Sequence, residues 1–379
     1  MAHDLSSLQT DWLRVARREN NTKRSYLLVN PLQAKHMPVA PSKALALFST
    51  LADQLRRAYP HDRFLVVGFA ETATAIGAAV AAALDAPAYY VHTTRETLPG
   101  LPHLVDFHES HSHAVEQILY CPQWPQWIAH VNHILFVEDE LTTGNTLLNF
   151  VQALSERALL PDSIAITAAS LVNGMQEAHM KRFREQNIAC HFLFSLDHVA
   201  LDEALQQHGF GTPEADRSPT PSRDFTSVQL HGKPEPRFGL SANAYPSACL
   251  SFAQRALSSI PPFRQHDSVL VLGTEECMYP AIMLGHVLEK SGHCVLTHAT
   301  TRSPIEPHQT AGYPLFERHS LPSVYDRSRQ TFLYNLAPYD RVIIVTDAAP
   351  EKAEFGLQAL AGALQHHACP AISVVHWLP

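Results

Sequence analysis

The sequence predicts an α/β fold made of two parallel-sheet, Rossmann-like domains. Short apolar runs alternate with amphipathic helical stretches along most of the 379 residues, a pattern typical of parallel sheets covered by helices. One of these runs ends in two adjacent carboxylates and a Thr/Gly/Asn loop, and a similar series of landmarks occurs again later in the chain. This internal duplication predicts that the two domains share one architecture.

Two strands are expected before that acidic run. The first covers residues 64–68 and leads through a polar turn, Glu71-Thr72-Ala73, into an Ala-rich helix. The second begins at residue 89 and ends at an arginine, Arg95. Ligands of parallel sheets bind beyond the carboxyl ends of the strands, so these polar residues are candidate site residues. The planar fork of Arg95 suits a phosphate-type anion, although a surface ion pair with Glu96 is an alternative.

The third strand carries the strongest motif. Residues 133–137 form a run that is continuously apolar from Ile134 onward, as expected for a strand buried on both faces. Glu138 and Asp139 follow it, where carboxylates can bind a vicinal diol and stabilise positive charge developing on a sugar ring. The next residues offer hydroxyls, a glycine and the backbone N–H groups of a helix start, which suit a phosphate: Thr142, Thr143, Gly144, Asn145 and Thr146. The alternative is a solvated acidic turn that caps the next helix.

The helix after this loop is supported by Leu147, Val151 and Leu154, which fall on one helical face. A polar segment between the second and third strands contains His111 and His113. This pair could bind a metal, act as a general acid or base, or neutralise pyrophosphate. A zinc site is disfavoured because no cysteine or carboxylate cluster with ligand spacing accompanies the pair.

The second half repeats these landmarks at similar spacing. Gly68 and Arg95 are 27 residues apart, and Gly273 and Arg302 are 29 apart. Asp139 finds its counterpart 45 residues beyond Arg302, in the run Val-Ile-Ile-Val-Thr-Asp that ends at residue 347. The acid pair and the glycine loop are not repeated, since the second copy has threonine before its aspartate and Pro-Glu-Lys-Ala-Glu at its helix start. Glutamates there repel phosphate.

We therefore expect the second copy to be degenerate and to have lost the phosphate site. Its polar and basic loop, Thr301-Arg302-Ser303, follows a strand and is a candidate site for another anion. The same loop could equally serve as a scaffold.

Composition indicates a cytoplasmic enzyme. The 28 Lys and Arg against 36 Asp and Glu argue against a partner such as duplex nucleic acid, which needs a broad basic face. Six scattered cysteines indicate reduced thiols. No apolar run reaches the ~18 residues of a membrane span, and the N-terminus lacks a signal-peptide pattern.

The domain boundary is expected near the Pro/Ser/Gly/Asp-rich stretch 211–236, read as a linker or as a long loop over the active site. This gives domains 1–236 and 237–379. Residues 1–60 precede the first sheet strand.

These motifs resemble those of type I phosphoribosyltransferases. The resemblance implies that residues 1–60 form a hood over the site. Over nearly its whole length the chain resembles bacterial proteins that join such a domain to a C-terminal TRSP domain, a name that matches Thr301-Arg302-Ser303-Pro304. The segments Phe316–Leu321 and Tyr334–Leu336 also carry the resemblance. Such proteins are associated with tellurite-resistance and stress-response gene clusters, and a role in making a nucleoside-like metabolite is proposed for them.

The resemblance implies transfer of ribose 5-phosphate from phosphoribosyl pyrophosphate (PRPP) to an acceptor, with magnesium (Mg²⁺) as cofactor. Glu138 and Asp139 would then hold the ribose and stabilise an oxocarbenium-like transition state, and the residues 142–146 would bind the 5-phosphate. Pyrophosphate would contact the Glu71-Thr72-Ala73 loop and Arg95, under a closing loop that contains His111 and His113. Glu71 departs from a simple anion site and could instead hold magnesium-bound water or a base.

Two other functions are also compatible with the sequence. The chain could be a regulator that binds PRPP without catalysis, or an enzyme that cleaves a nucleotide-like product. Transferases of this type are often dimers, so a homodimer is a candidate assembly.

Overall fold

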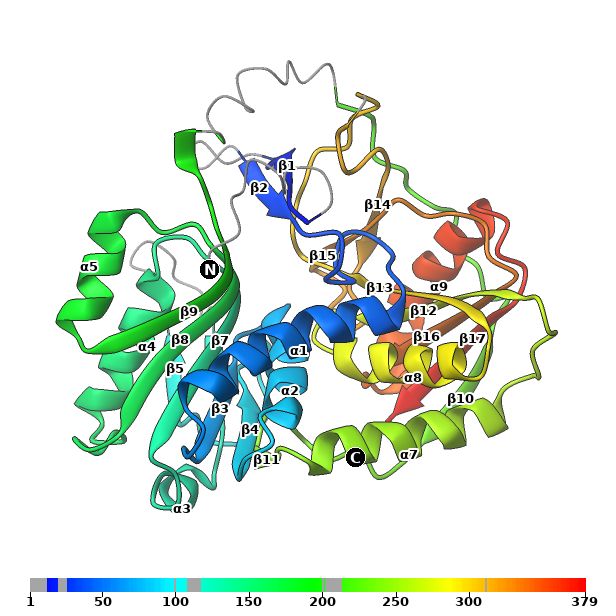
Figure 1. Cartoon of the computed structure of the whole chain (residues 1–379). Helices are drawn as coiled ribbons and strands as arrows, with labels where there is room; N and C mark the ends of the chain where they lie inside the picture. The colour runs from blue at the N-terminus through cyan, green and yellow to red at the C-terminus, as the bar shows by residue number, and fades with distance from the viewer. Residues whose placement is uncertain are drawn as a thin grey trace. The chain divides into compact units, whose positions relative to one another are not determined.

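The computed structural model describes residues 12–19, 26–98, 100–107, 117–199, 201, 213–310 and 312–379. It is an α/β structure built on two parallel sheets, which confirms the predicted fold class (Figure 1). The chain divides into two compact units. The described residues of unit 1 lie within 46–196 and 234–248, and those of unit 2 lie within 4–45, 197–233 and 249–379.

Unit 1 contains a six-stranded sheet in the order β11-β4-β3-β7-β8-β9. All neighbours pair in parallel except the short edge strand β11, which pairs antiparallel with β4. The strands are β3 (Phe64–Gly68), β4 (Ala88–His92), β7 (His133–Leu141), β8 (Ala165–Asn173), β9 (Ile188–Ser195) and β11 (Leu240–Ser241), with a separate hairpin of β5 (Val105–Phe107) and β6 (Gln117–Leu119).

The helices of unit 1 are α2 (Ala73–Ala83), α3 (Trp124–Ile128), α4 (Asn145–Glu156) and α5 (Glu177–Glu185); α1 (Pro41–Ala58) and α7 (Ala244–Ser259) have residues in both units. Among the helices of unit 1, α2 packs against β3, β4 and β7, α5 packs against β9, and α4 packs against β5. Gly77 lets α2 lie very close to β3, since a Cβ at this position would be 3.0 Å from the Gly68 Cα. β3 is buried along its whole length, as its apolar sequence predicts.

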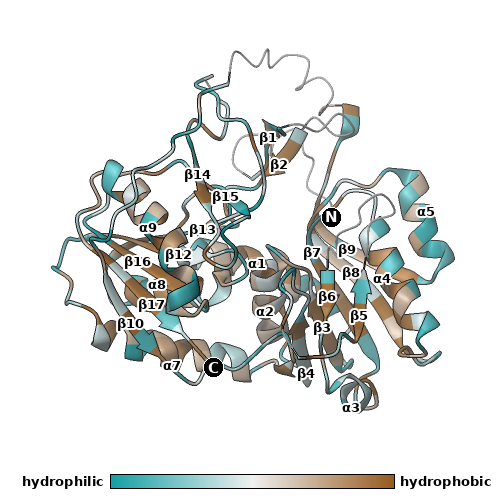
Figure 2. Ribbon diagram, turned by 180° about the vertical axis from the view of Figure 1, so that it is seen from behind, coloured by the Kyte–Doolittle hydropathy of each residue, from teal (hydrophilic) through white to brown (hydrophobic). Residues whose placement is uncertain are grey.

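Unit 2 contains a five-stranded parallel sheet in the order β10-β17-β16-β12-β13. Its strands are β10 (Thr226–Leu230), β12 (Ser268–Thr274), β13 (Cys294–Thr300), β16 (Arg341–Thr346) and β17 (Ile372–Trp377), its main helices are α8 (Met278–Lys290) and α9 (Pro350–His366), and a hairpin is formed by β14 (Arg318–Pro322) and β15 (Gln330–Tyr334). Figure 2 shows the strands of both sheets as predominantly hydrophobic.

The two sheets share a strand order. The series β4-β3-β7-β8 of unit 1 corresponds to β13-β12-β16-β17 of unit 2. In each sheet the same glycine position marks the register: Gly68 pairs with His92 and Val137, and Gly273 pairs with Ala299 and Val345. An antiparallel hairpin also lies between β4 and β7 in the chain, and another lies between β13 and β16. These matches support the proposal that unit 2 is a degenerate copy.

The N-terminal segment packs within unit 2. The antiparallel strands β1 (Arg14–Arg17) and β2 (Tyr26–Val29) contribute to an apolar cluster with Ile305, Leu315 and Tyr334. A hood formed by residues 1–60 stays a prediction, but the described residues before 46 belong to unit 2.

The stretch expected to be a linker contains a strand. Residues 226–230 form β10, which pairs in parallel with β17 at the edge of the unit 2 sheet. Val228 and Leu230 are partly buried there. The strand was not predicted because its short alternating pattern lies within a Pro/Ser/Gly/Asp-rich sequence. A domain boundary near residue 236 stays a prediction.

Among the residues that the structure describes, no helix is both long enough and apolar enough to cross a membrane.

We predict that Gly68→Ala destabilises unit 1. The new Cβ would lie 2.6 Å from the backbone oxygen of Ala73, and a backbone atom at the start of a buried helix cannot move aside without shifting the helix. The free energy of unfolding from urea denaturation should fall by about 1–3 kcal/mol. In the control Gly174→Ala, the Cβ first meets the end of the flexible Glu140 side chain at 3.2 Å. Equal losses in both variants would contradict this account.

Candidate functional site

The polar segments singled out in the sequence of unit 1 begin at one edge of its sheet. β3 ends at Gly68, whose neighbours across the sheet are His92 of β4 and Val137 of β7. The loop after β3, the residues after His92 and the acidic residues after Val137 therefore start side by side. The parallel register brings together segments that are up to 70 residues apart in the sequence.

The strand β7 continues beyond the residue where the sequence predicts its end. It runs to Leu141 because β8 is long enough to pair with it, with Glu138 opposite Ser170 and Glu140 opposite Val172. β3 ends at the level of Val137, so the acidic part of β7 lies beyond β3. Glu138, Asp139 and Glu140 are half-buried.

Local hydrogen bonds hold these carboxylates near the backbone. The Glu140 N–H donates to Asp139 Oδ1 at 3.0 Å, and the Asp139 N–H donates to Glu138 Oε1 at 3.3 Å. The sequence motif identified two carboxylates at this strand end; the structure adds Glu140 as a third.

The loop between β7 and α4 depends on Gly144. Its φ of 68° lies in the left-handed region, where glycine is favoured. A Cβ at this position would also lie 2.2 Å from Phe183 Cε2. The helix α4 then begins at Asn145, and the predicted apolar face of Leu147, Val151 and Leu154 is buried. The structure thus contains the predicted loop and helix start. The loop residues are Thr142, Thr143 and Gly144, and the helix starts with Asn145 and Thr146.

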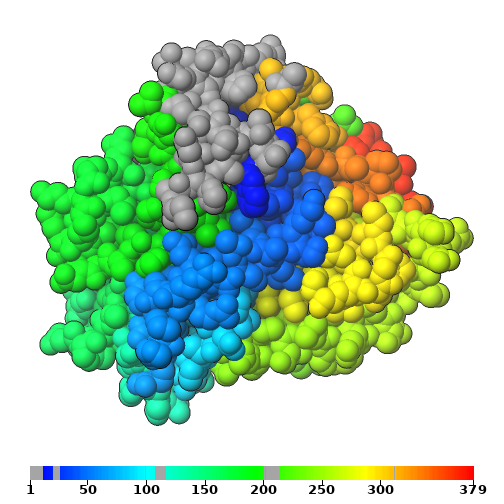
Figure 3. Space-filling model, viewed as in Figure 1, coloured from blue at the N-terminus to red at the C-terminus, as the bar shows by residue number. Residues whose placement is uncertain are grey.

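A basic residue that the sequence analysis missed lies beside this helix start. Arg182 Nη1 donates to Asn145 Oδ1 at 2.6 Å. Arg182 belongs to α5, whose residues are largely exposed and lie in the green region of Figure 3. Sequence spacing gave no signal for this contact because 37 residues separate the two partners.

The loop after β3 is fixed by buried polar groups. The Thr93 hydroxyl accepts from the Ala70 N–H at 2.9 Å and donates to Gln117 Oε1 at 2.5 Å. Gln117 Nε2 in turn donates to the Ala70 carbonyl at 2.5 Å. The Ala70–Glu71 peptide is cis. Gln117 is the first residue of the short strand β6 and belongs to no sequence motif, so the sequence did not mark it as a candidate.

The predicted anion loop leads directly into α2. Glu71, Thr72 and Ala73 are buried, and α2 begins at Ala73. The Thr74 hydroxyl donates to the Glu71 carbonyl at 2.9 Å, and the buried Tyr90 hydroxyl donates to the Thr74 carbonyl at 2.6 Å. These bonds tie the start of α2 to β4.

Arg95 is exposed just after β4. The predicted histidine pair, His111 and His113, lies outside the described residues.

The corresponding edge of unit 2 is occupied by internal ion pairs. Arg302 Nε bonds Glu275 Oε2 at 2.8 Å, and Arg329 Nη1 bonds the same oxygen at 3.0 Å. On either side of Arg302 in the predicted anion loop, Thr301 pairs through its backbone with Phe332, and the Ser303 carbonyl accepts from Tyr334.

Asp347, the counterpart of Asp139, is also paired within unit 2. Its Oδ2 lies 3.0 Å from Lys233 Nζ, and its Oδ1 accepts from the Tyr325 hydroxyl at 2.6 Å. Burial, together with the nearby Asp347 carboxylate, raises the pKa of Tyr325 well above its usual value. The phenol therefore stays protonated and keeps donating to Asp347.

Comparison with protein families gives a match over residues 12–204 to the family described as phosphoribosyl transferase, about half of the chain. The chain belongs to this family. Residues 235–364 match the TRSP domain that lies C-terminal to the phosphoribosyl transferase domain. The family resemblance inferred from the sequence is confirmed, and the activity class is phosphoribosyl transfer.

Solved structures include similar chains of low identity. An APRTase from Giardia lamblia complexed with 9-deazaadenine is 18% identical, with 49% of this chain and 94% of that chain covered and a TM-score of 0.34. An adenine phosphoribosyltransferase from Leishmania tarentolae is 16% identical, with 51% and 88% covered and a TM-score of 0.35. An orotate phosphoribosyltransferase from Aeropyrum pernix is 15% identical, with 52% and 94% covered and a TM-score of 0.32. A search of curated proteins gave no match.

We predict that Thr93→Val loosens the loop after β3. The substitution keeps the side-chain shape but leaves the buried Ala70 N–H without the oxygen that accepts from it. The free energy of unfolding should fall by about 1–3 kcal/mol, and PRPP binding measured by calorimetry should weaken.

Thr300→Val is the matched control. The Thr300 hydroxyl accepts from the Glu275 N–H at 3.1 Å, the same bond in unit 2. This variant should lose stability but keep its affinity for PRPP. A loss of PRPP affinity in Thr300→Val, or none in Thr93→Val, would refute the prediction.

Proposed function

We propose that unit 1 is a Mg²⁺-dependent phosphoribosyltransferase. It transfers ribose 5-phosphate from PRPP to a base-like acceptor in a nucleoside-like metabolite pathway and releases pyrophosphate. The observation that supports this most is the strand order β4-β3-β7, in which an acidic strand end, a polar loop and a basic loop begin at one edge of the sheet.

The acidic strand end is suited to the ribose. In the displacement, the bond from the anomeric carbon to pyrophosphate breaks while a bond to the acceptor forms, and positive charge develops on the ring. The carboxylates of Glu138 and Asp139 accept hydrogen bonds from the ribose hydroxyls and stabilise that charge. They are the catalytic residues of this proposal, and Glu140 is close enough along β7 to contribute to the local negative field.

The start of α4 is suited to the 5-phosphate. Its first N–H groups have no partner within the helix and carry the positive end of the helix dipole. The left-handed Gly144 shapes the loop before them, and Arg182 adds a positive charge beside Asn145. Binding this remote phosphate orients the reacting carbon and so lowers the barrier.

The loop after β3 is suited to pyrophosphate. Backbone N–H groups of Glu71, Thr72 and Ala73 stand at the beginning of α2, and the exposed Arg95 follows the adjacent strand. We propose that His111 and His113 close over this side, accept part of the pyrophosphate charge and exclude water.

The donor set fits a hard divalent cation. Carboxylate oxygens at the end of β7 are ligands of the kind that Mg²⁺ prefers, and this ion is commonly bound through one or two carboxylates together with substrate phosphates. PRPP itself would hold the ion through its pyrophosphate and ribose hydroxyls, with Glu138 and Asp139 nearby, and when bound the ion would neutralise pyrophosphate as a leaving group.

Unit 2 is proposed to have lost PRPP binding. The carboxylate of Asp347 is ion-paired with Lys233 and accepts a hydrogen bond from the Tyr325 hydroxyl. An anion at Thr301, Arg302 and Ser303 would have to compete with Glu275 for Arg302.

We predict that Asp139→Asn lowers turnover by about 10²–10³-fold, the usual effect of removing one group that stabilises transition-state charge. Stability should change little, since Asp139 is half-buried at a strand end. Release of pyrophosphate from PRPP and Mg²⁺ would be followed across a panel of purine, pyrimidine and related bases.

The matched control is Asp347→Asn, the same substitution in unit 2. It should lower stability by breaking the contact with Lys233 but leave pyrophosphate release unchanged. An unchanged rate in Asp139→Asn would remove this residue from the mechanism. Saturable PRPP binding without pyrophosphate release from any base would favour the non-catalytic regulator instead.

A second prediction concerns Arg182. Arg182→Ala should weaken PRPP binding about tenfold, as expected for the loss of one charged hydrogen bond near a phosphate. The control is Arg184→Ala on the same helix, whose guanidinium pairs with Glu177 and should not affect PRPP. Similar effects of the two substitutions would mean that only the general charge of α5 matters.

A further inference from the structure

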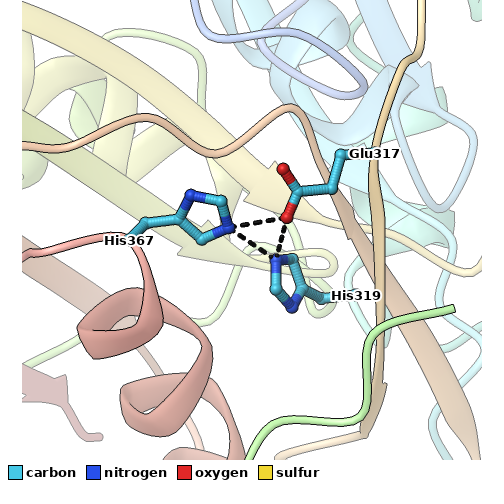
Figure 4. Close-up of side chains that lie close together, drawn as sticks. All are labelled: Glu317, His319 and His367. Carbon is cyan, nitrogen blue, oxygen red and sulfur yellow. Dashed lines mark hydrogen bonds and ion pairs between the residues drawn. The ribbon is translucent and has the colours of Figure 1, made fainter. Parts of the chain in front are cut away.

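Unit 2 contains a cluster of two histidines and a glutamate that the transfer reaction does not use. Glu317 directly precedes β14, His319 is the second residue of that strand, and His367 follows the last residue of α9. The helix α9 packs against β14, which brings His367 to the other two residues. Figure 4 shows the three side chains converging on one point.

The three nearest atoms form a small triangle. Glu317 Oε1 lies 2.7 Å from His319 Nε2 and 2.6 Å from His367 Nε2, and the two nitrogens are 3.0 Å apart. Alternation along the strand places Glu317 and His319 on one face. His319 is 1% exposed and Glu317 is 8% exposed, so protein rather than bulk water surrounds this point.

Hydrogen bonds alone satisfy this triangle poorly. Each imidazole nitrogen carries at most one hydrogen, and an ionised carboxylate carries none. If both nitrogens donate to Glu317, two N–H groups face each other across 3.0 Å. If one nitrogen donates to the other, one contact with Glu317 has no hydrogen.

A cation above the triangle would satisfy all three atoms at once, because each of them can offer a lone pair to it. Three ligand atoms that are ~2.1 Å from one ion and at right angles to each other lie about 3.0 Å apart. The observed separations of 2.6–3.0 Å approach this facial arrangement.

The ligand types select a class of metal. Two imidazoles and one carboxylate bind Zn²⁺ or another divalent first-row transition metal, and they leave coordination positions for water or a substrate. Ca²⁺ and Mg²⁺ prefer sites made of oxygen alone. The cluster also differs from the site proposed for Mg²⁺ in unit 1, where the ion binds through PRPP with carboxylates nearby.

Arg217 is the group that now balances the charge of the cluster. Its Nε lies 3.3 Å from Glu317 Oε1, and its Nη1 lies 2.9 Å from His366 Nε2. The Arg217 side chain is half-exposed, so it can swing towards solvent. Its departure would expose both the carboxylate and a neighbouring imidazole to an incoming ion.

We propose that Glu317, His319 and His367 form a binding site for Zn²⁺ or a related divalent transition metal in unit 2. The site is independent of PRPP binding, and its ligands come from β14 and from the end of α9. Metal binding would therefore tie α9 to the β14–β15 hairpin.

The test is Zn²⁺ binding to the full chain after treatment with a chelator. Competition with a chromogenic chelator should give one tight site per chain, and Zn²⁺ should raise the unfolding temperature. His367→Gln should weaken the site at least about tenfold and remove the thermal shift. His367 is the choice because it is only partly buried, and Glu317→Gln, which keeps the side-chain shape, is the second variant.

Two controls separate this site from other binding. His266→Gln changes an exposed histidine outside the cluster and should leave Zn²⁺ binding unchanged. Arg217→Gln should preserve or increase Zn²⁺ affinity by removing the competing cation. The Co²⁺-substituted protein should show d–d bands without a thiolate charge-transfer band, because no cysteine belongs to the cluster.

The proposal is overturned if the native chain binds no Zn²⁺ tightly, or if its tight site survives both His367→Gln and Glu317→Gln. A thiolate band would equally assign the metal to cysteines and overturn it. PRPP binding in the presence of Mg²⁺ is expected to be the same for the Zn²⁺-free and the Zn²⁺-loaded chain, so failure of this proposal leaves the proposed function untouched.

Discussion

The site of unit 1 depends on the hydrogen-bonded register between β3 and its two neighbours. Gly68 is paired with His92 on one side and Val137 on the other, so three chain segments leave the sheet at one level. Because parallel strands all point the same way, their carboxyl ends present the following loops on one edge. The acidic residues, the loop before α2 and the basic residue after β4 can therefore act on one ligand, although the sequence separates them widely.

Unit 2 has the same strand order, but different side chains lie at the carboxyl ends of its strands. Thr93 and Thr300 each accept a backbone N–H from the loop beside them, so the support of that loop is common to both copies. The side chains around it differ. Glu275, buried in unit 2, binds Arg302 and Arg329, and Asp347 is paired with Lys233. Charges that could meet a ligand in one unit are balanced internally in the other.

Sequence reasoning succeeded where a pattern is local. Buried parallel strands are continuous apolar runs, and the acid pair with its glycine loop is contiguous, so β3, β7 and α4 were predictable. The extent of β7 and the existence of β10 could not be predicted, because they depend on pairing between strands. Pairing with β8 extends β7, and β10 forms by pairing with β17 at the edge of the sheet. Gln117, Arg182 and the cluster of Glu317, His319 and His367 escaped notice for the same reason, since distant segments or short strands bring them into place.

The central claim is that one of two similar units retains PRPP binding. Calorimetric titration of the native chain with PRPP in the presence of Mg²⁺ tests it most directly. We expect one saturable site per chain that disappears when Mg²⁺ is removed. Two sites would contradict the loss of binding in unit 2, and the absence of any binding would contradict the assignment of the edge of unit 1 as a PRPP site.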